Sequence, residues 1–178
     1  YVMRKDWLIH LINEAVARNL QHFERDILQS RLHEIKIHGY EVPSLVMPIY
    51  SLSSYYNANL ALLDSEVRAQ LFPNTRPVYT KVRDSAPTRY AMDAKVNESL
   101  VADGCILEGT VENSVLFRGV QVKKGAVVRN SILMQDTVVE EGACVDCVIT
   151  DKNVTISAGK SVSGSTEYPV YVEKHVKV

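Results

Sequence analysis

The chain has 178 residues, a formal net charge of −1 and 46% hydrophobic residues. This near-neutral balance offers no global electric field that would attract nucleic acid or anionic lipid. No apolar run approaches the length that crosses a membrane, and no signal peptide opens the chain. We therefore expect a cytoplasmic protein without nucleic-acid or membrane partners, whose length suits one large domain or two small ones.

The first seventy residues have helical apolar spacing, which one alternating stretch interrupts. An amphipathic pattern follows a capping Asp6, and a last helical pattern follows Ser51 or Ser53 as N-cap. Between them, apolar and polar residues alternate about Gly39, as in two strands joined by a turn. The packing residues expected on the last helix include Tyr55, Leu60 and Leu63. The predicted elements are helices over residues 6–20, 25–35 and 51–72 and two strands within residues 33–47.

A repeat begins near residue 100. Residues 111–116 read VENSVL, residues 128–133 read VRNSIL seventeen positions later, and residues 145–150 give a weaker copy, VDCVIT. Aliphatic residues recur in steps of six or five, a period that fits neither a half-buried strand nor a helix. Such hexapeptide repeats predict a parallel β-helix, in which three short faces make one coil and the aliphatic residues form internal ladders. The recurring residues are Leu116, Val122, Val128, Leu133, Val139 and Val145.

Turn residues support the same interpretation. Four glycines recur three residues into their units, where the chain must turn a corner and a positive φ costs glycine least. Two packed sheets joined by hairpins are the alternative, but the Asn-Gly or Asp-Gly turns of hairpins are missing. We therefore divide the chain into residues 1–71, an extended proline-containing linker over residues 72–96 and a β-helix over residues 97–178. The four glycines are Gly119, Gly125, Gly142 and Gly159.

Catalytic motifs are missing from the sequence. No glycine-rich phosphate loop occurs, and four of the five histidines lie before residue 40 without metal-ligand spacing. Cys144 and Cys147 have C-x-x-C spacing, but no second pair or nearby histidine completes a zinc site, so we interpret them and Cys105 as ordinary repeat positions. We predict no catalytic residue and no metal ligand. Four basic residues at exposed coil positions could bind a phosphorylated effector, or simply form a solvated polar face: Arg118, Lys123, Lys124 and Arg129.

Three segments closely resemble bacterial ADP-glucose pyrophosphorylase, also called glucose-1-phosphate adenylyltransferase. They read SYYNANLALL at residues 54–63, SLVADGCILEGTVENSVLFRGVQV at residues 99–122 and NSILMQDTVVEEGA at residues 130–143. In that family, a nucleotidyltransferase domain of Rossmann-like α/β fold precedes a left-handed β-helix. The resemblance implies a C-terminal fragment, in which the C-terminal edge of the α/β domain is followed by a left-handed parallel β-helix of hexapeptide repeats.

One departure from the family pattern is informative. Catalytic members carry a W-R-D-V-G-T string just before the helix that matches SYYNAN, and its aspartate holds a metal ion beside the nucleotide phosphates. VMPIYS at residues 46–51 stands in that place here, so Met47 replaces the arginine and Pro48 replaces the aspartate. Proline has no carboxylate with which to hold Mg²⁺. The resemblance is therefore to the regulatory, catalytically impaired GlgD-type subunit.

The resemblance implies that the intact enzyme uses Mg²⁺ to convert ATP and glucose 1-phosphate to ADP-glucose and pyrophosphate in glycogen biosynthesis. The fragment itself is expected to hold no cofactor, to be inactive alone and to serve oligomerisation with the catalytic subunit, with itself or with both. One alternative is a hexapeptide-repeat acyltransferase, which needs a histidine base on the coil, where only His175 occurs after residue 97. Another is a purely structural assembly module that binds neither nucleotide nor sugar.

Overall fold

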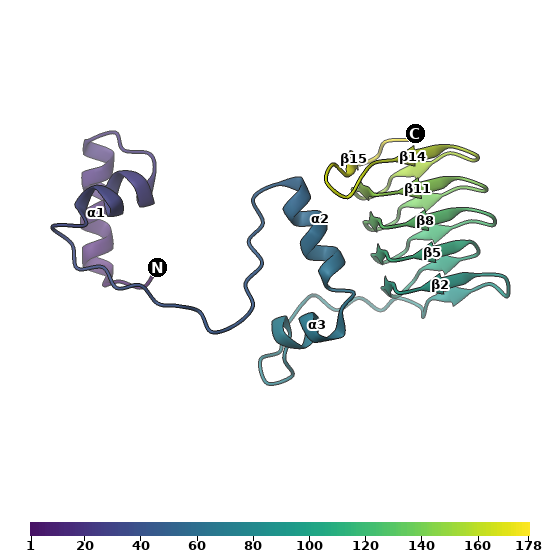
Figure 1. Ribbon diagram of the computed structural model, residues 1–178, viewed down its shortest axis with the longest axis horizontal. Coiled ribbons are helices and arrows are strands. Elements are labelled where there is room, and N and C mark those ends of the chain that lie inside the picture. The colour runs from purple at the N-terminus through teal and green to yellow at the C-terminus, as the bar shows by residue number, and fades with distance from the viewer. The chain divides into compact units, whose positions relative to one another are not determined.

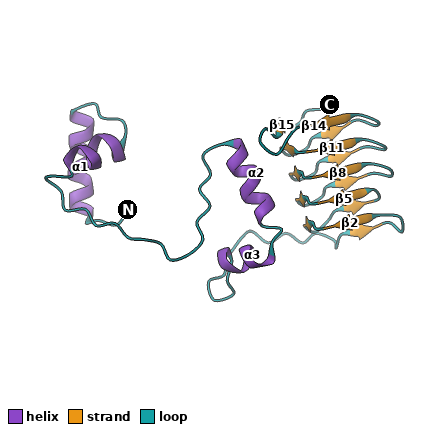
Figure 2. Ribbon diagram, in the orientation of Figure 1, coloured by secondary structure: helices purple, strands orange, loops and turns teal.

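Helices occupy the chain before residue 72 and every strand lies after residue 88, as the computed structural model of residues 1–178 shows (Figures 1 and 2). The chain divides into two units, Tyr1–Val42 and Pro43–Val178, which are described separately. None of the helices has the length and apolar composition that a membrane crossing requires.

The unit Tyr1–Val42 contains only short helices. Leu11 and Ile27 are its buried apolar residues. The Arg18 guanidinium lies 2.9 Å from the Glu14 carboxylate, which also accepts a hydrogen bond from Arg31, and the Arg31 bond lowers the pKa of Glu14.

The first predicted helix is confirmed, but the predicted cap at Asp6 is wrong, because Arg4 is the N-cap and Asp6 lies within the first turn. Two short helical segments together take the place of the second predicted helix. The helices are α1 (Lys5–Ala17), the π-helix η1 (Phe23–Leu28) and the 3₁₀-helix η2 (Gln29–Arg31).

The two strands predicted within residues 33–47 are absent, and that prediction is wrong. Residues 36–50 form no strand, and no other strand precedes Arg89. A two-stranded hairpin is marginally stable by itself and needs a third strand or a packed helix. The alternating apolar residues, including Val42 and Val46, are exposed instead of lining one buried face. Alternation alone therefore did not determine the local structure.

Two helices replace the single helix predicted over residues 51–72. Ser51 caps the first, because its hydroxyl accepts the Ser54 N–H at 3.1 Å while the Ser51 N–H donates to the Ser54 hydroxyl at 2.8 Å. The break falls before Asp64, whose carboxylate accepts the Glu66 N–H at 2.7 Å and starts the second helix. The helices are α2 (Leu52–Ala61) and α3 (Ser65–Leu71).

Three five-stranded parallel sheets form the coil, and one coil contributes one strand to each sheet. The parallel stack confirms the expected β-helix of hexapeptide repeats and is consistent with a left-handed coil. Sheet A contains β1 (Arg89–Tyr90), β4 (Ile106–Leu107), β7 (Gln121–Val122), β10 (Val138–Val139) and β13 (Thr155–Ile156). Sheet B contains β2 (Lys95–Asn97), β5 (Thr110–Glu112), β8 (Val127–Arg129), β11 (Cys144–Asp146) and β14 (Ser161–Ser163). Sheet C contains β3 (Leu100–Val101), β6 (Val115–Leu116), β9 (Ile132–Leu133), β12 (Val148–Thr150) and β15 (Val170–Val172).

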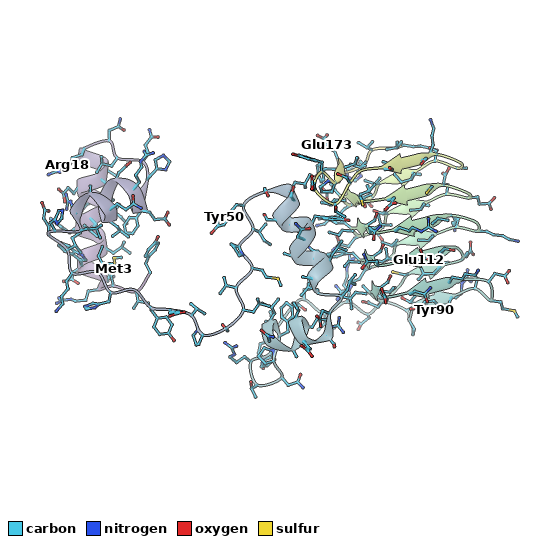
Figure 3. The ribbon with its side chains drawn as sticks, in the orientation of Figure 1. Met3, Arg18, Tyr50, Tyr90, Glu112 and Glu173 are labelled. Carbon is cyan, nitrogen blue, oxygen red and sulfur yellow. The ribbon has the colours of Figure 1, made fainter.

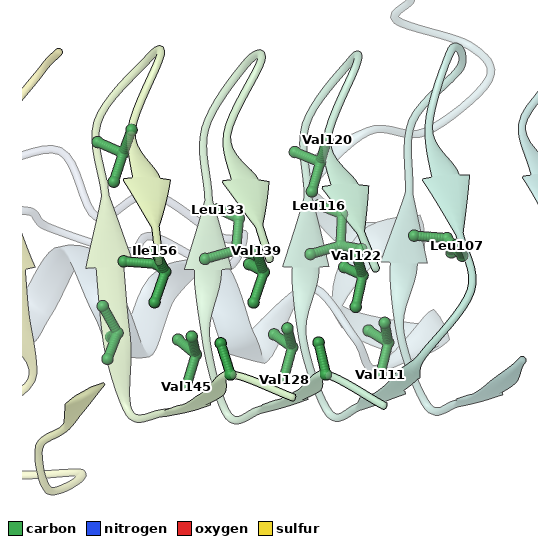
Figure 4. Close-up of a cluster of buried hydrophobic side chains, with 14 of the residues drawn as sticks. Leu107, Val111, Leu116, Val120, Val122, Val128, Leu133, Val139, Val145 and Ile156 are labelled. Carbon is green, nitrogen blue, oxygen red and sulfur yellow. The ribbon is translucent and has the colours of Figure 1, made fainter. Parts of the chain in front are cut away.

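Aliphatic side chains stack inside the coil in continuous ladders (Figure 4). In sheet A, the register places Leu107, Val122, Val139 and Ile156 in one column, and each is fully buried. Burial of one such side chain stabilises the fold by roughly 1.5–3 kcal/mol. The predicted ladder is confirmed, because Leu116, Val122, Val128, Leu133, Val139 and Val145 are all at most 1% exposed.

The corner glycines have the backbone conformation that the sequence predicted. All four have φ between +67° and +73°, a region that other residues rarely adopt. Gly119 also permits a close approach, since a Cβ atom there would lie 2.3 Å from the Asp136 Oδ1 atom.

The β-ladder begins within the segment expected to be linker. The Arg89 N–H donates to the Cys105 carbonyl at 2.9 Å, and the Lys95 N–H donates to the Gly109 carbonyl at 3.1 Å. The sequence does not mark β1 as a repeat unit, because Tyr90 stands at the inward position where later coils have an aliphatic residue. Residues 89–96 are thus paired chain, whereas residues 72–88 contain no strand.

Helix α2 lies along the outer side of sheet C (Figure 1). Tyr56 is fully buried there, and its hydroxyl donates to the Asn130 carbonyl at 2.5 Å. Burial raises the pKa of Tyr56. The predicted packing residues are confirmed, because Tyr55, Leu60 and Leu63 pack against the same cluster. Its buried members are Tyr56, Val115, Ile132 and Ile149.

A serine ladder follows the corner between sheets B and C. The Ser99 hydroxyl accepts the Ser114 N–H, the Ser114 hydroxyl accepts the Ser131 N–H, and the Ser131 hydroxyl accepts the Val148 N–H, each at 3.1 Å. Each hydroxyl thereby satisfies the backbone donor of the next coil, where a buried unpaired N–H would cost free energy.

An asparagine ladder runs beside the serines. The Asn113 side-chain amide donates to the Asn130 side-chain oxygen at 2.7 Å, and the Asn130 amide donates to the Asp146 carboxylate at 2.9 Å. Asn113 and Asn130 have φ of +47° and +45°, and Cys147 has φ of +53° at the equivalent position of the next coil. Asparagine tolerates this left-handed conformation better than cysteine does.

Substitutions of Tyr56 test the packing of α2 on sheet C. We expect Tyr56→Phe to lower the free energy of unfolding by about 1 kcal/mol through loss of the hydrogen bond to Asn130. We expect Tyr56→Ala to lower it by about 4 kcal/mol, because a cavity is added. Urea denaturation measures both changes. The matched control is Tyr50→Phe, which is 89% exposed and should leave stability unchanged; equal losses at both positions would contradict the assigned role.

Cys147→Asn tests the strain at the corner. We expect the free energy of unfolding to rise by about 0.5–1 kcal/mol, because asparagine adopts a positive φ at lower cost. The control is Cys144→Asn on β11, where the backbone is extended and asparagine is disfavoured, so stability should fall or stay constant. A loss of stability in Cys147→Asn with no loss in the control would refute the strain argument.

Candidate functional site

A basic pocket of about 380 Å³ lies at the corner between sheets C and A. Arg118, Gln135 and Lys152 stand there seventeen positions apart, so they occupy the same corner of three successive coils. Lys81 and Arg83, from the extended segment that precedes β1, add two cations to those of Arg118 and Lys152. The lining residues are Lys81, Arg83, Arg118, Gln135, Asp136, Lys152 and Asn153.

The pocket carries an excess of positive charge. Four cationic side chains and one carboxylate, Asp136, line it, which leaves a formal charge of +3. The Arg118 guanidinium is paired with Asp103, at 3.0 Å, and this bond lowers the pKa of Asp103. Lys81, Arg83 and Lys152 make no ion pair. Unpaired cations that converge on a concave surface are suited to an anion.

Gln135 adds an unsatisfied polar group to the same pocket. Its Oε1 atom is buried and has no hydrogen-bond partner. A buried acceptor without a partner is costly. A turn of the amide would instead present its N–H donors to a ligand oxygen. Together with the cations, Gln135 makes this pocket suitable for a phosphate-bearing molecule.

The four basic residues singled out from the sequence lie at different corners. Arg118 is in the turn from sheet C to sheet A and lines the pocket. Lys123 and Lys124 are in the turn from sheet A to sheet B, and Arg129 ends β8, where its guanidinium pairs with Glu112 at 2.8 Å. Only Arg118 therefore meets other cations in a pocket.

Sequence reasoning missed the other cations of the pocket. The seventeen-residue spacing of Arg118, Gln135 and Lys152 was a usable signal, since the same spacing relates the two NS strings. The contribution of Lys81 and Arg83 was not readable, because they lie outside the repeat and reach the corner only through the path of the extended segment.

Pro48, which the resemblance places where catalytic members hold a metal-binding aspartate, has no side-chain ligand for a metal ion. Pro48 lies in the extended segment between residues 43 and 50, between the exposed Ile49 and the partly exposed Met47. No group of three or more histidine, cysteine, aspartate or glutamate side chains is arranged to hold a metal ion. His175, the histidine that an acyltransferase would need, is exposed in the turn after β15.

The three cysteines are free thiols. Cys105 and Cys147 are buried, and burial raises the pKa of both thiols. A raised pKa keeps a cysteine protonated and unreactive near neutral pH. Cys144 lies on β11, in line with Val127 and Ser161 of the neighbouring strands. The thiols therefore occupy ordinary repeat positions.

Comparisons with known proteins agree with this architecture. Residues 84–168 match the family model described as GlmU-like, C-terminal hexapeptide. The chain is 43% identical over 150 residues to the glycogen biosynthesis protein GlgD of Bacillus subtilis (strain 168). This match covers 84% of this chain and 44% of that protein. It is 54% identical over 71 residues to GlgD of Geobacillus stearothermophilus, covering 40% of this chain and 21% of that protein.

A catalytic enzyme is among the relatives as well. The chain is 34% identical over 119 residues to the glucose-1-phosphate adenylyltransferase of Geobacillus stearothermophilus. This match covers 66% of this chain and 31% of that enzyme. The chain spans less than half the length of these curated relatives. The resemblance stated from the sequence is confirmed by these matches.

Proposed function

We propose that this GlgD-like chain is part of the regulatory subunit of a glucose-1-phosphate adenylyltransferase that serves glycogen biosynthesis in the cytoplasm. The observation that carries the proposal is the 43% identity to GlgD, which extends over 150 residues and so includes both helical and coil segments. The complete enzyme would convert ATP and glucose 1-phosphate to ADP-glucose and pyrophosphate, with Mg²⁺ held by a catalytic subunit.

The contribution of this chain would be assembly, not catalysis. Pro48 stands where the resemblance implies a metal-binding aspartate, and the chain offers no other cluster of metal ligands. Without a carboxylate-held metal, the negative charge that develops on the phosphates is not neutralised. The coil offers two sheets that no helix covers, A and B, and strand edges at its ends, which a partner can contact.

Co-expression tests the assembly role. We expect tagged chain 1–178 to capture the catalytic subunit of the same organism, because the coil carries the contact surface. We expect a chain that lacks residues 86–178 to lose that capture. Affinity purification followed by gel electrophoresis measures both.

The same preparation provides the control for catalysis. Chain 1–178 without the catalytic subunit should form no ADP-glucose from ATP and glucose 1-phosphate in the presence of Mg²⁺. Full capture of the catalytic subunit by the truncated chain would contradict the proposed assembly role. Formation of ADP-glucose by chain 1–178 alone would contradict the assignment to a catalytically impaired subunit.

We further propose that the basic pocket holds the phosphate group of an effector. The four cations support a phosphate-bearing ligand at this corner. Among them, Arg118 was already indicated by the sequence. Lys123, Lys124 and Arg129 belong to the solvated outer surface in this assignment.

Loss of one pocket cation should weaken anion binding. We expect Lys152→Ala to raise the dissociation constant for pyrophosphate about tenfold, because one charge-assisted hydrogen bond is lost. Isothermal titration calorimetry measures the constant. Lys124→Ala, at another corner, is the matched control and should leave binding unchanged. Equal weakening by the two variants would show that pyrophosphate responds to net charge and not to this pocket.

A further inference from the structure

The extended segment that leads into β1 is tied to the corner of the first coil between sheets C and A. The Gly104 N–H donates to the Ala86 carbonyl at 2.7 Å. The Thr88 hydroxyl donates to the Ala102 carbonyl at 2.7 Å and accepts the Cys105 N–H at 3.3 Å. These bonds anchor the end of the segment at the corner whose later coils carry the basic pocket.

The residues just before this anchor are held by no comparable bonds. Residues 77–84, which we call the strap, are all exposed and make no backbone–backbone hydrogen bond. Tyr79 and Val82 are 91% and 83% exposed. An exposed backbone with few buried apolar contacts is the property of segments that open locally at a low cost in free energy. The strap can therefore leave the surface of the coil without disturbing its core.

The strap brings two cations toward other cations. Lys81 and Arg83 line the basic pocket together with Arg118 and Lys152. Asp136 is the one carboxylate among the lining residues. Like charges repel, and a concave surface concentrates their field. Charge therefore opposes a close approach of the strap to the corner unless an anion lies between them.

The strap is long enough to run beside the whole pocket. Figure 3 places Tyr90, which follows the anchored end, at one end of the stack and Glu173 at the other. Successive coils are about 4.8 Å apart, so Arg118 and Lys152, two coils apart, stand roughly 10 Å apart along the corner. An extended chain covers about 13 Å in four residues, so the strap can lie beside both cations.

We propose that a phosphate-bearing anion in the basic pocket draws the strap onto the corner, so that the strap and the coil together enclose the anion. Lys81 and Arg83 would donate charge-assisted hydrogen bonds to the anion from one side, and Arg118 and Lys152 would donate from the other. The anion shifts the strap toward the closed position because it gains the two strap cations only there. This inference rests on the proposed phosphate site and adds that part of the site closes on binding.

Limited digestion of chain 1–178 with chymotrypsin tests the closure. Chymotrypsin cleaves after exposed tyrosines, and Tyr79 reports on the strap without being one of its cations. We expect pyrophosphate, at about ten times its dissociation constant, to slow cleavage after Tyr79 about fivefold or more, because the protease acts on the open population. Cleavage after Tyr40, which is 82% exposed in the other unit, is the internal control and should keep its rate. Mass spectrometry of the fragments measures both rates.

A double variant of the strap tests its contribution to the site. Lys81→Ala combined with Arg83→Ala should remove the protection of Tyr79 and raise the dissociation constant for pyrophosphate about tenfold or more, because two charged donors are lost. Lys123→Ala combined with Lys124→Ala lowers the net charge equally at another corner and should leave both quantities unchanged. Equal effects of the two double variants would contradict a specific role of the strap.

Lys152→Ala keeps both strap cations but removes one from the coil. We expect it to lose most of the protection of Tyr79 at the same pyrophosphate concentration; full protection would show that the anion binds the strap alone and would overturn the proposal. Closure is also overturned if pyrophosphate binds in calorimetry without slowing cleavage after Tyr79, or if it slows cleavage after Tyr40 equally. Either of these results leaves the phosphate site itself intact, whereas absence of any binding in calorimetry refutes the site and the closure together.

Discussion

The alignment of each strand with its partner in the next coil is the constraint on which the other features depend. Strands pair in parallel with the strand fifteen or seventeen positions later, as in the series Arg89, Ile106, Gln121, Val138 and Thr155 of sheet A, except that β12 pairs with β15 at an interval of 22 positions. A slip of one residue would turn every inward aliphatic side chain toward water, so the buried ladders fix the register of all three sheets. Because the backbone path repeats, residues at the corners also stack. The same registry that builds the core thus brings Arg118, Gln135 and Lys152 to one corner.

The outward side chains explain why α2 covers sheet C and not the other sheets. On sheet C the outward column contains Val115, Ile132 and Ile149, which pack against Tyr56. The outward residues of sheet B include Thr110, Cys144 and Ser161 together with an ion pair between Arg129 and Glu112. A helix gains free energy only where it removes apolar area from water. Sheet C is buried on both faces, which is typical of parallel sheets.

The repeat region was predictable because its period is enforced at every coil. Leu116, Val122 and Val128 could be assigned to the core from spacing alone, since each inward position meets the same surroundings as the one before. The span of helix α1 and the Ser51 cap were also readable, because local hydrogen bonds determine them. The pocket was only partly readable: Arg118 lies within the repeat, but Lys81 and Arg83 lie outside it.

Failures of prediction had a common physical cause. Residues 33–47 have the alternation of strands, but strands need neighbours, and none is available before Arg89. The start of the first coil resembles a linker in sequence because Tyr90, its first inward residue, is aromatic and half exposed where later coils have a buried aliphatic residue. The boundary between α2 and α3 depends on one carboxylate, that of Asp64, within a continuous helical pattern. Non-local pairing and single capping bonds are the features that spacing does not encode.

Arg118 connects the basic pocket with the first coil. Its guanidinium lines the pocket in the turn before β7, yet it also pairs with Asp103, which lies in the first coil between β3 and β4. The pair is partly exposed, so its net contribution to stability is small and the guanidinium can exchange partners at little cost. A phosphate bound in the pocket would compete with Asp103 for the same N–H donors. Release of Asp103 would then leave a free carboxylate in the turn between β3 and β4, so occupancy of the corner would change the charge of the first coil.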